Sequence, residues 1–133
     1  MAEYVTDTHP LLWYSTETYR KLSPRVRRIF DKASRGEALI WIPAMAVWEA
    51  GLLQKIGRIQ FKPSFTRWVD ALVAQAGFAF APLDRDLITA SLDIAPNTDL
   101  FDTGIVATAK HKNLALITKD GVITDSKVVE TVW

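Results

Sequence analysis

The sequence predicts a three-layer α/β/α fold with a central, mainly parallel sheet of four to five strands. Short apolar runs alternate with longer stretches of helical periodicity, an order typical of parallel sheets that helices cover on both faces. The chain has 133 residues, of which 49% are hydrophobic, so it is long enough to bury a core of its own. No internal repeat, linker or low-complexity tract divides it, and we expect a single domain over residues 1–133.

Apolar spacing, proline and glycine define the elements. Apolar runs of strand length without helical spacing indicate strands, and apolar residues that recur every three or four positions indicate helices. Ser23 and Pro24, for example, supply a helix N-cap and a first-turn proline, and Gly36 supplies a stop. In order, we expect a strand at 3–6, a helical stretch after Asp7, a helix at 24–35, a strand at 38–42, a helix between Pro43 and Gly57, a helix at 64–76, a strand at 78–83, helices at 84–94 and 100–112, a strand at 114–118, a turn at 119–121 and an edge strand within 127–132.

Composition excludes several classes of protein. The chain has no cysteine, which rules out disulfide scaffolds and thiolate sites and suits the reducing cytoplasm. Charged residues precede any long apolar run at the N-terminus, and Pro43 interrupts the longest uncharged run, so we expect neither a signal peptide nor a membrane span. The net charge of +1 and the mean hydropathy of +0.06 are those of a globular protein without an overall basic surface.

Two aspartates follow predicted strands directly. Asp7 comes after the strand at 3–6, and Asp120 after the strand at 114–118. Ligands of open α/β sheets bind at the carboxyl ends of parallel strands. Aspartate is also a common turn residue and helix N-cap, so each position is open to a structural explanation as well.

Glu49 lies on the apolar face of its predicted helix. At helical offsets from it stand only apolar residues, namely Met45, Ala46, Leu52, Leu53 and Ile56. Burying an unpaired carboxylate costs several kcal/mol, so Glu49 needs either an ion-pair partner or a metal. The one basic residue within a turn, Lys55, falls outside this face.

Asp99 and Asp102 begin the late helix, one turn apart. Asp102 continues into an apolar face formed by Ile105, Val106 and Ala109, whereas Asp99 has an alternative role as the helix N-cap. Two carboxylates about 4 Å apart repel by roughly 4 kcal/mol at an effective dielectric near 20, so a cluster of such groups needs a cation or bound protons. Oxygen ligands without cysteine favour Mg²⁺ or Mn²⁺ over zinc, and such ions activate water to hydrolyse phosphate esters.

Three segments, VTDTHPLLW, VWEAGLLQKIGRI and DLFDTGIVATAKHKNLALITKD, resemble in order and spacing the PIN-domain family. More narrowly, they resemble the VapC-type toxin ribonucleases of type II toxin–antitoxin systems. The resemblance covers essentially the whole chain. It implies a Mg²⁺- or Mn²⁺-dependent endoribonuclease that is usually a homodimer, that cuts transfer, ribosomal or messenger RNA, and that a cognate antitoxin protein inhibits.

The resemblance also implies the site residues. The family's four acids fall on Asp7, Glu49, Asp102 and Asp120, which it identifies as catalytic metal ligands, and Asp99 matches an additional aspartate. Thr6 and Thr118 precede two of these acids and are candidates to hydrogen-bond to them, or are plain strand residues. Relatives often carry D-P-F-D-R where this chain has DLFDT, so an arginine that would contact substrate or orient an acid is missing.

The basic residues are candidates for a functional role only if the protein binds RNA. Residues 20–35 contain seven lysines and arginines against Asp31 alone, which a solvated helix face also explains. As RNA contacts, the candidates are Arg25, Arg27 and Arg28, with Lys55, Arg58 and Lys62 as a second group. His9 is expected to be an ordinary turn or helix-start residue. Trp13, Trp41, Trp48 and Trp68 are expected in the core or on a partner surface rather than as base-stacking platforms.

Three alternatives remain open from the sequence. The first is a PIN-domain nuclease that processes RNA and is not a toxin. The second is a receiver-like or phosphatase-like domain that gathers aspartates around Mg²⁺, but Asp7 lacks the acidic neighbours that those domains use. The third is a PIN-like binding module without metal, which the presence of all four acids disfavours.

Overall fold

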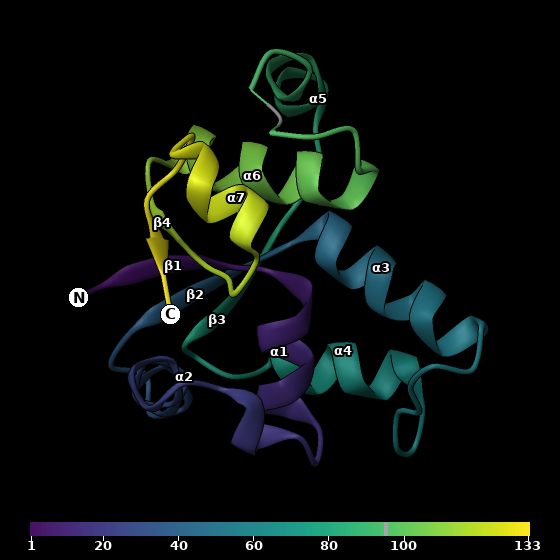
Figure 1. Ribbon diagram of the computed structural model, residues 1–133. Helices are drawn as coiled ribbons and strands as arrows, with labels where there is room; N and C mark the ends of the chain where they lie inside the picture. Colours follow the sequence, from purple (N-terminus) through teal and green to yellow (C-terminus); the bar gives the residue numbers. More distant parts are fainter. Residues whose placement is uncertain (95) are drawn as a thin grey trace.

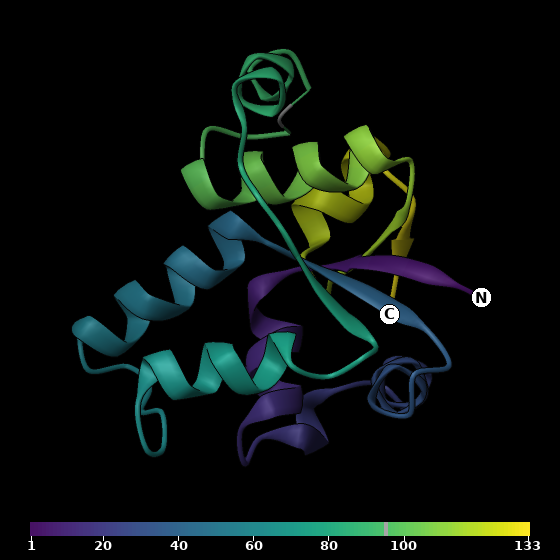
Figure 2. The ribbon, with the colours of Figure 1, turned by 180° about the vertical axis from the view of Figure 1, so that it is seen from behind.

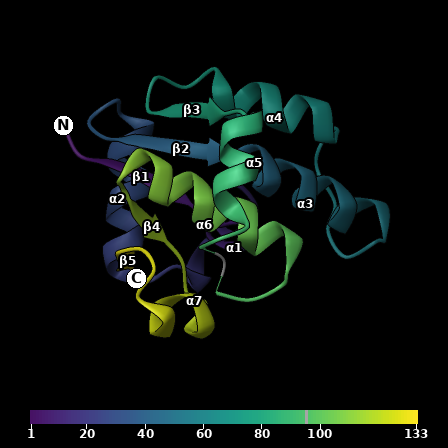
Figure 3. The same ribbon diagram turned by 90° about the horizontal axis from the view of Figure 1, so that it is seen from above.

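Five parallel strands form the central sheet of the computed structural model, which describes residues 1–94 and 96–133. The strands lie in the order β3-β2-β1-β4-β5, and every neighbouring pair is parallel (Figure 3). Their bounds are β1 Glu3–Thr6, β2 Leu39–Pro43, β3 Phe78–Ala81, β4 Ala115–Ile117 and β5 Thr131–Val132.

The strand order reverses beside β1. From β1 the chain builds outward through β2 to β3, and then crosses to the other side of β1 for β4 and β5. Val5 of β1 therefore pairs with Trp41 on one side and with Leu116 on the other. Such a reversal leaves a crevice at the carboxyl ends of the two strands, where the connections leave toward opposite faces. Asp7 follows β1 at this point, and its backbone N–H donates to the Ile117 carbonyl at 2.9 Å.

Helices cover both faces of the sheet (Figures 1 and 2). Below it in Figure 1 are α1, α2 and α4, packed on a core that includes Phe30 and Ile40; above it are α6 and α7, packed on Val5, Ile105 and Leu116. Their bounds are α1 Thr8–Ser15, η1 Tyr19–Lys21, α2 Pro24–Ser34, α3 Ala44–Lys55, α4 Phe65–Val73, α5 Arg85–Ser91, α6 Leu100–Lys112 and α7 Gly121–Ser126. Among the described residues, no helix is both long enough and apolar enough to cross a bilayer.

Helix α3 leaves the carboxyl edge of the sheet and approaches α6 closely at its first turn (Figure 3). Gly104 of α6 makes this approach possible, because a Cβ at that position would collide with the Met45 side chain of α3. The contact brings the two helices that carry Glu49 and Asp102 together at the same edge of the sheet.

The predicted fold class is confirmed, and the sheet is parallel throughout. The edge strand expected within 127–132 is present as β5, and the turn at 119–121 leads into the short helix α7, which the sequence pattern did not predict. One local prediction was wrong, because the expected core face of α3 does not continue to its end. Leu52 and Ile56 are exposed, because this half of α3 extends past the sheet and has no strand beneath it.

Candidate active site

Asp7 is fixed across the gap between β1 and β4. It caps α1, and its Oδ1 accepts a hydrogen bond from the Thr8 backbone N–H at 2.8 Å. Its Oδ2 accepts from the Thr118 hydroxyl at 2.7 Å, a contact between residues 111 positions apart in the chain. The carboxylate is buried, and this burial raises its pKa, an effect that Glu49 strengthens and the two hydrogen bonds oppose.

Thr118 connects Asp7 to Asp120. Its hydroxyl donates to Asp7 and accepts from the Asp120 backbone N–H at 3.0 Å. Asp120 in turn caps α7, with its Oδ1 accepting from the Ile123 N–H at 2.9 Å. Thr118 thus makes the hydrogen bond expected of it, whereas the Thr6 hydroxyl donates to the Asp7 main-chain carbonyl and not to the carboxylate.

Glu49 is half-buried on α3, close to the first turn of α1. Burial raises its pKa, as do Asp99 and Asp102, while the Thr8 hydroxyl and His9 favour its ionised form. The Thr8 side chain is completely buried, and its hydroxyl makes no hydrogen bond of standard geometry with the described residues. The contact that the structure gives this hydroxyl is with the Glu49 carboxylate, whose ionised form it favours.

Asp102 is held by a turn that the sequence did not reveal as part of the site. Asp99 is the N-cap of α6 and accepts from the Asp102 N–H at 2.9 Å. Asn97 accepts from the Asp99 N–H at 2.8 Å and donates from Nδ2 to Asp102 Oδ2 at 3.1 Å. The Pro96-Asn97 pair predicts a turn, but only the folded loop brings the amide onto the acid.

Burial raises the pKa of Asp102 to about 6, with further contributions from Asp7, Asp99 and Asp120 against the Asn97 hydrogen bond. The pKa values of Asp7, Glu49 and Asp102 are therefore all raised. In each case, the negative charge of at least one of the other two carboxylates contributes to the rise. The two ion pairs in the described part of the chain, Arg35–Glu37 and Arg85–Asp86, involve none of them. The cost of burying the Glu49 carboxylate is therefore not offset by an ion pair with any of the described residues.

The donor set suits a hard divalent ion in its chemistry. Its oxygens come from carboxylates that repel one another, which is the kind of ligand that Mg²⁺ and Mn²⁺ prefer. Within residues 1–94 and 96–133, however, no three acidic or histidine side chains are close enough to hold one ion directly. Mg²⁺ keeps several waters in protein sites, so carboxylates spaced this widely fit an ion that they bind partly through water.

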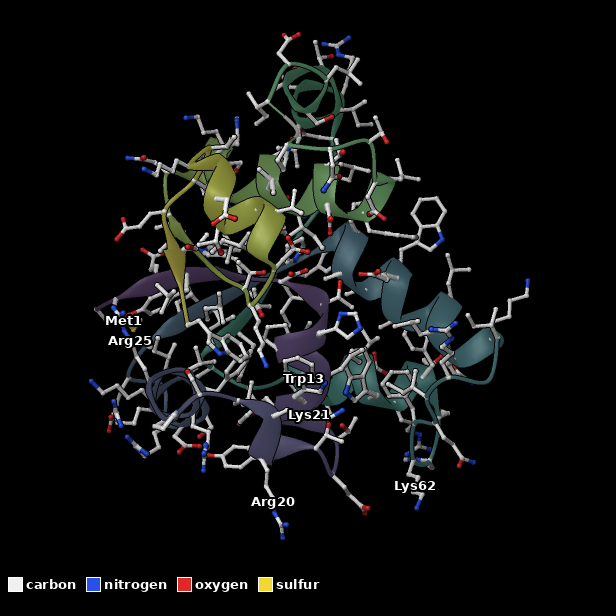
Figure 4. The ribbon with its side chains drawn as sticks, viewed as in Figure 1. Met1, Trp13, Arg20, Lys21, Arg25 and Lys62 are labelled. Atoms are coloured by element: carbon white, nitrogen blue, oxygen red, sulfur yellow. The ribbon has the colours of Figure 1, made fainter. Side chains whose placement is uncertain are left out.

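The candidate RNA contacts occupy separate places. Helix α2 lies toward the amino ends of the strands, away from the end of β1 that Asp7 follows, and its Arg25 is exposed (Figures 3 and 4). Arg28 is exposed on the same helix, while Arg27 packs over the Tyr19 ring at 5.6 Å with a buried Nε. Lys55 and Arg58 are exposed at the far end of α3 and in the loop after it.

The raised pKa of Asp102 makes a prediction about stability. Below pH 3.8 the carboxyl is protonated in both folded and unfolded protein, and above about pH 6 the folded state carries the full cost of the charge. Asp102→Asn removes that cost, and for a half-buried group we expect a gain of about 1 kcal/mol at neutral pH. Urea unfolding without metal at several pH values measures it.

In that experiment the advantage of Asp102→Asn shrinks as the pH falls toward 4. Asp125→Asn, at an exposed carboxylate of α7, is the matched control and changes the free energy of unfolding little at any pH. A neutral-pH stability equal to or below that of the wild type would show that the Asp102 charge is not destabilising.

Comparison with known proteins identifies the family. The PIN domain family matches residues 4–126 of the chain, whereas no curated protein matches it in sequence. Similar solved structures include VapBC2 from Rickettsia felis bound to a DNA fragment from its promoter, with 12% identity over 98% of both chains and a TM-score of 0.67. FitAB bound to an IR36 DNA fragment shares 19% identity over 97% of this chain and 93% of that one, with a TM-score of 0.70.

FitAcB from Neisseria gonorrhoeae shares 18% identity over 98% of this chain and 96% of that chain, with a TM-score of 0.66. At these identities the solved structures establish the fold, and they agree with the resemblance to VapC-type proteins. The family match covers nearly the entire sheet and every acid of the crevice. The chain therefore belongs to the PIN domain family, whose members are nucleases.

Proposed function

We propose that the protein is a divalent-metal-dependent endoribonuclease and the toxin of a type II toxin–antitoxin pair. The observation that carries the proposal is the crevice at the ends of β1 and β4, where burial and mutual repulsion raise the pKa of Asp7, Glu49 and Asp102, and where none of them forms an ion pair with the described residues. Groups in this state bind a cation strongly, because the cation removes their repulsion. Membership in a family of nucleases supplies the reaction class.

Each acid has a distinct part in the proposed site. Asp7, Glu49 and Asp102 would hold Mg²⁺ or Mn²⁺, directly or through water, and Asp120 and Asp99 would complete the set. The ion supplies positive charge that activates a water and stabilises the leaving oxygen of an RNA phosphodiester. Thr118 keeps Asp7 in one orientation, Asn97 does the same for Asp102, and the Thr8 hydroxyl favours the ionised form of Glu49.

The partners are proposed on the same basis. The similar structures VapBC2, FitAB and FitAcB carry names of two components, and two of them are bound to DNA fragments. We expect a cognate antitoxin to bind this chain and to inhibit it in the cytoplasm. We also expect a homodimer, formed through the exposed apolar side chains of Trp48, Leu52 and Phe80 at the junction of α3 and β3.

Asp7→Asn is expected to abolish RNA cleavage and growth arrest while leaving the fold intact. Asparagine can still cap α1 through its Oδ1, and the Thr118 hydroxyl can accept from the new amide, but the negative charge is lost. Cleavage of a mixed RNA substrate with Mg²⁺ or Mn²⁺, together with circular dichroism, tests this. Asp125→Asn is the control and should cut like the wild type; cleavage by Asp7→Asn at the wild-type rate would remove Asp7 from the site.

Divalent metal is expected to raise the melting temperature of the wild type. An ion at ten times its Kd adds about 1.4 kcal/mol to the free energy of unfolding, which corresponds to several degrees for a domain of this size. Differential scanning calorimetry with MgCl₂ or MnCl₂, against KCl of equal ionic strength, measures the shift. We expect the Asp7→Asn/Asp102→Asn protein to respond much less, and an unchanged wild type would contradict metal binding.

Trp48→Asp is expected to shift the protein from dimer to monomer in sedimentation-velocity ultracentrifugation. The substitution places a charge at the centre of the apolar face, where a second copy would have to desolvate it. Val122→Asp introduces the same charge at an equally exposed apolar residue of α7 and should leave the dimer intact. A wild type that is monomeric at micromolar concentration would contradict the dimer directly.

A further inference from the structure

A cavity of about 820 Å³ opens beside the acidic crevice. One wall comes from α1 and η1, and the other from the loop between α3 and α4 together with α4 itself. His9 belongs to both regions: it lines the cavity, and it is near enough to Asp7 and Glu49 to favour their ionised forms. The cavity therefore starts where the crevice ends, and its size is that of a pocket for a small organic ligand.

Three aromatic side chains, Trp13, Phe61 and Trp68, line the cavity. Phe61 and Trp68 are buried, with their ring centroids 4.3 Å apart, and the indole N–H of Trp68 donates to Ser15 Oγ of α1 at 2.9 Å. Trp13 is half-buried and packs against the core, in line with our expectation from the sequence. Its remaining surface is the aromatic surface that a flat ligand in the cavity could contact.

The mouth of the cavity is basic. Lys21, Arg58 and Lys62 are exposed there and face only one acid, Glu17. None of the three forms an ion pair with the described residues. Lys21 lies 5.7 Å from the Trp13 ring, which Figure 4 shows directly above it, and Lys62 marks the opposite wall. Their charges are therefore free to meet an anion.

Hydrogen-bonding groups complete the lining. Thr16, Thr18 and Gln60 border the cavity, and Gln60 is exposed. Aromatic surfaces, unpaired cations and a few amide or hydroxyl groups are what single-stranded nucleic acid requires, with stacking for bases, charge for phosphates and hydrogen bonds for base edges. An apolar helix would use the aromatic lining but would gain nothing from three cations at the mouth.

We propose that this cavity binds a nucleotide of single-stranded RNA next to the phosphate in the acidic crevice, and that it selects which sequence is cut. The base packs against the exposed part of the Trp13 ring with Gln60 at its edge, and Lys21, Arg58 and Lys62 bind the flanking phosphates. The proposal rests on the proposed ribonuclease function. To that ribonuclease the proposal adds a site that determines sequence specificity, and the residues of this site lie outside the acid cluster.

Binding is tested in the Asp7→Asn background, so that RNA is not consumed. Fluorescence anisotropy with a labelled single-stranded RNA of mixed sequence gives Kd at several salt concentrations in the presence of Mg²⁺. Adding Arg58→Gln and Lys62→Gln should weaken binding about tenfold at low salt and reduce the salt slope by roughly 0.7 for each phosphate that the protein no longer neutralises. Lys32→Gln with Lys127→Gln removes the same charge from exposed positions outside the cavity and should change Kd less than about twofold.

Specificity is tested with active enzyme. Gln60→Ala is compared with the wild type on a randomised RNA pool, and the cut ends are sequenced. We expect cleavage to continue with an altered nucleotide preference beside the cut. Gln75→Ala, in the turn after α4 and outside the cavity lining, should leave the preference unchanged.

The outcomes separate this proposal from the function on which it rests. If the wild type cuts no RNA, the ribonuclease function fails. A second outcome is that the wild type cuts RNA, while the cavity double variant and the Lys32→Gln/Lys127→Gln control weaken binding equally and Gln60→Ala leaves the nucleotide preference unchanged. In that case the cavity is not a nucleotide site. If the cavity variants bind RNA normally and lose only an antitoxin, the cavity is a protein docking surface and the proposal is overturned.

Discussion

The rest of this structure depends on three carboxylates, those of Asp7, Glu49 and Asp102, that are held partly out of water at one edge of the sheet. Burial and mutual repulsion raise their pKa, and none of them forms an ion pair with the described residues, so the folded protein at neutral pH carries an electrostatic cost that the unfolded chain does not. The two apolar cores, one on each face of the sheet, must offset that cost. In the proposed function, cation binding would release this free energy.

The topology of the sheet imposes this arrangement, because it brings distant segments to one edge. Asp7 and Thr118 meet only because β4 returns to the free side of β1 after the chain has built β2 and β3. Glu49 and Asp102 meet because Gly104 allows α6 to lie against Met45 of α3. Polar groups from the connecting turns, Thr118 and Asn97, then hold individual acids in place, so that the charges cannot simply rotate into solvent.

Residues whose role follows from local pattern were predictable from the sequence, and those whose role needs tertiary contacts were not. Asp7 and Asp120 follow strands directly, and the strand order of a parallel sheet places them at one edge. The predicted buried face of α3 was correct at Met45 and Ala46 but wrong at Leu52 and Ile56, which are exposed. Periodicity in the sequence cannot show where a helix extends beyond the sheet that it covers. The hydrogen bond from Asn97 to Asp102 and the position of the Thr8 hydroxyl beside Glu49 carry no such pattern and emerge only in the fold.

The acid cluster creates a difficulty for any RNA substrate that the remainder of the surface has to solve. A crevice of carboxylates repels phosphates, and a chain of net charge +1 exerts little long-range attraction that would overcome the repulsion. A bound cation reverses the local sign at the reacting phosphate alone, and it carries no information about sequence. Affinity for the neighbouring nucleotides must therefore come from cations that stand apart from the acids, and selectivity from surfaces that contact bases. The cavity beside His9 has Lys21, Arg58 and Lys62 at its mouth and the half-buried Trp13 ring inside, so in the proposed function the chemistry and the choice of substrate would be divided between adjoining regions of one fold.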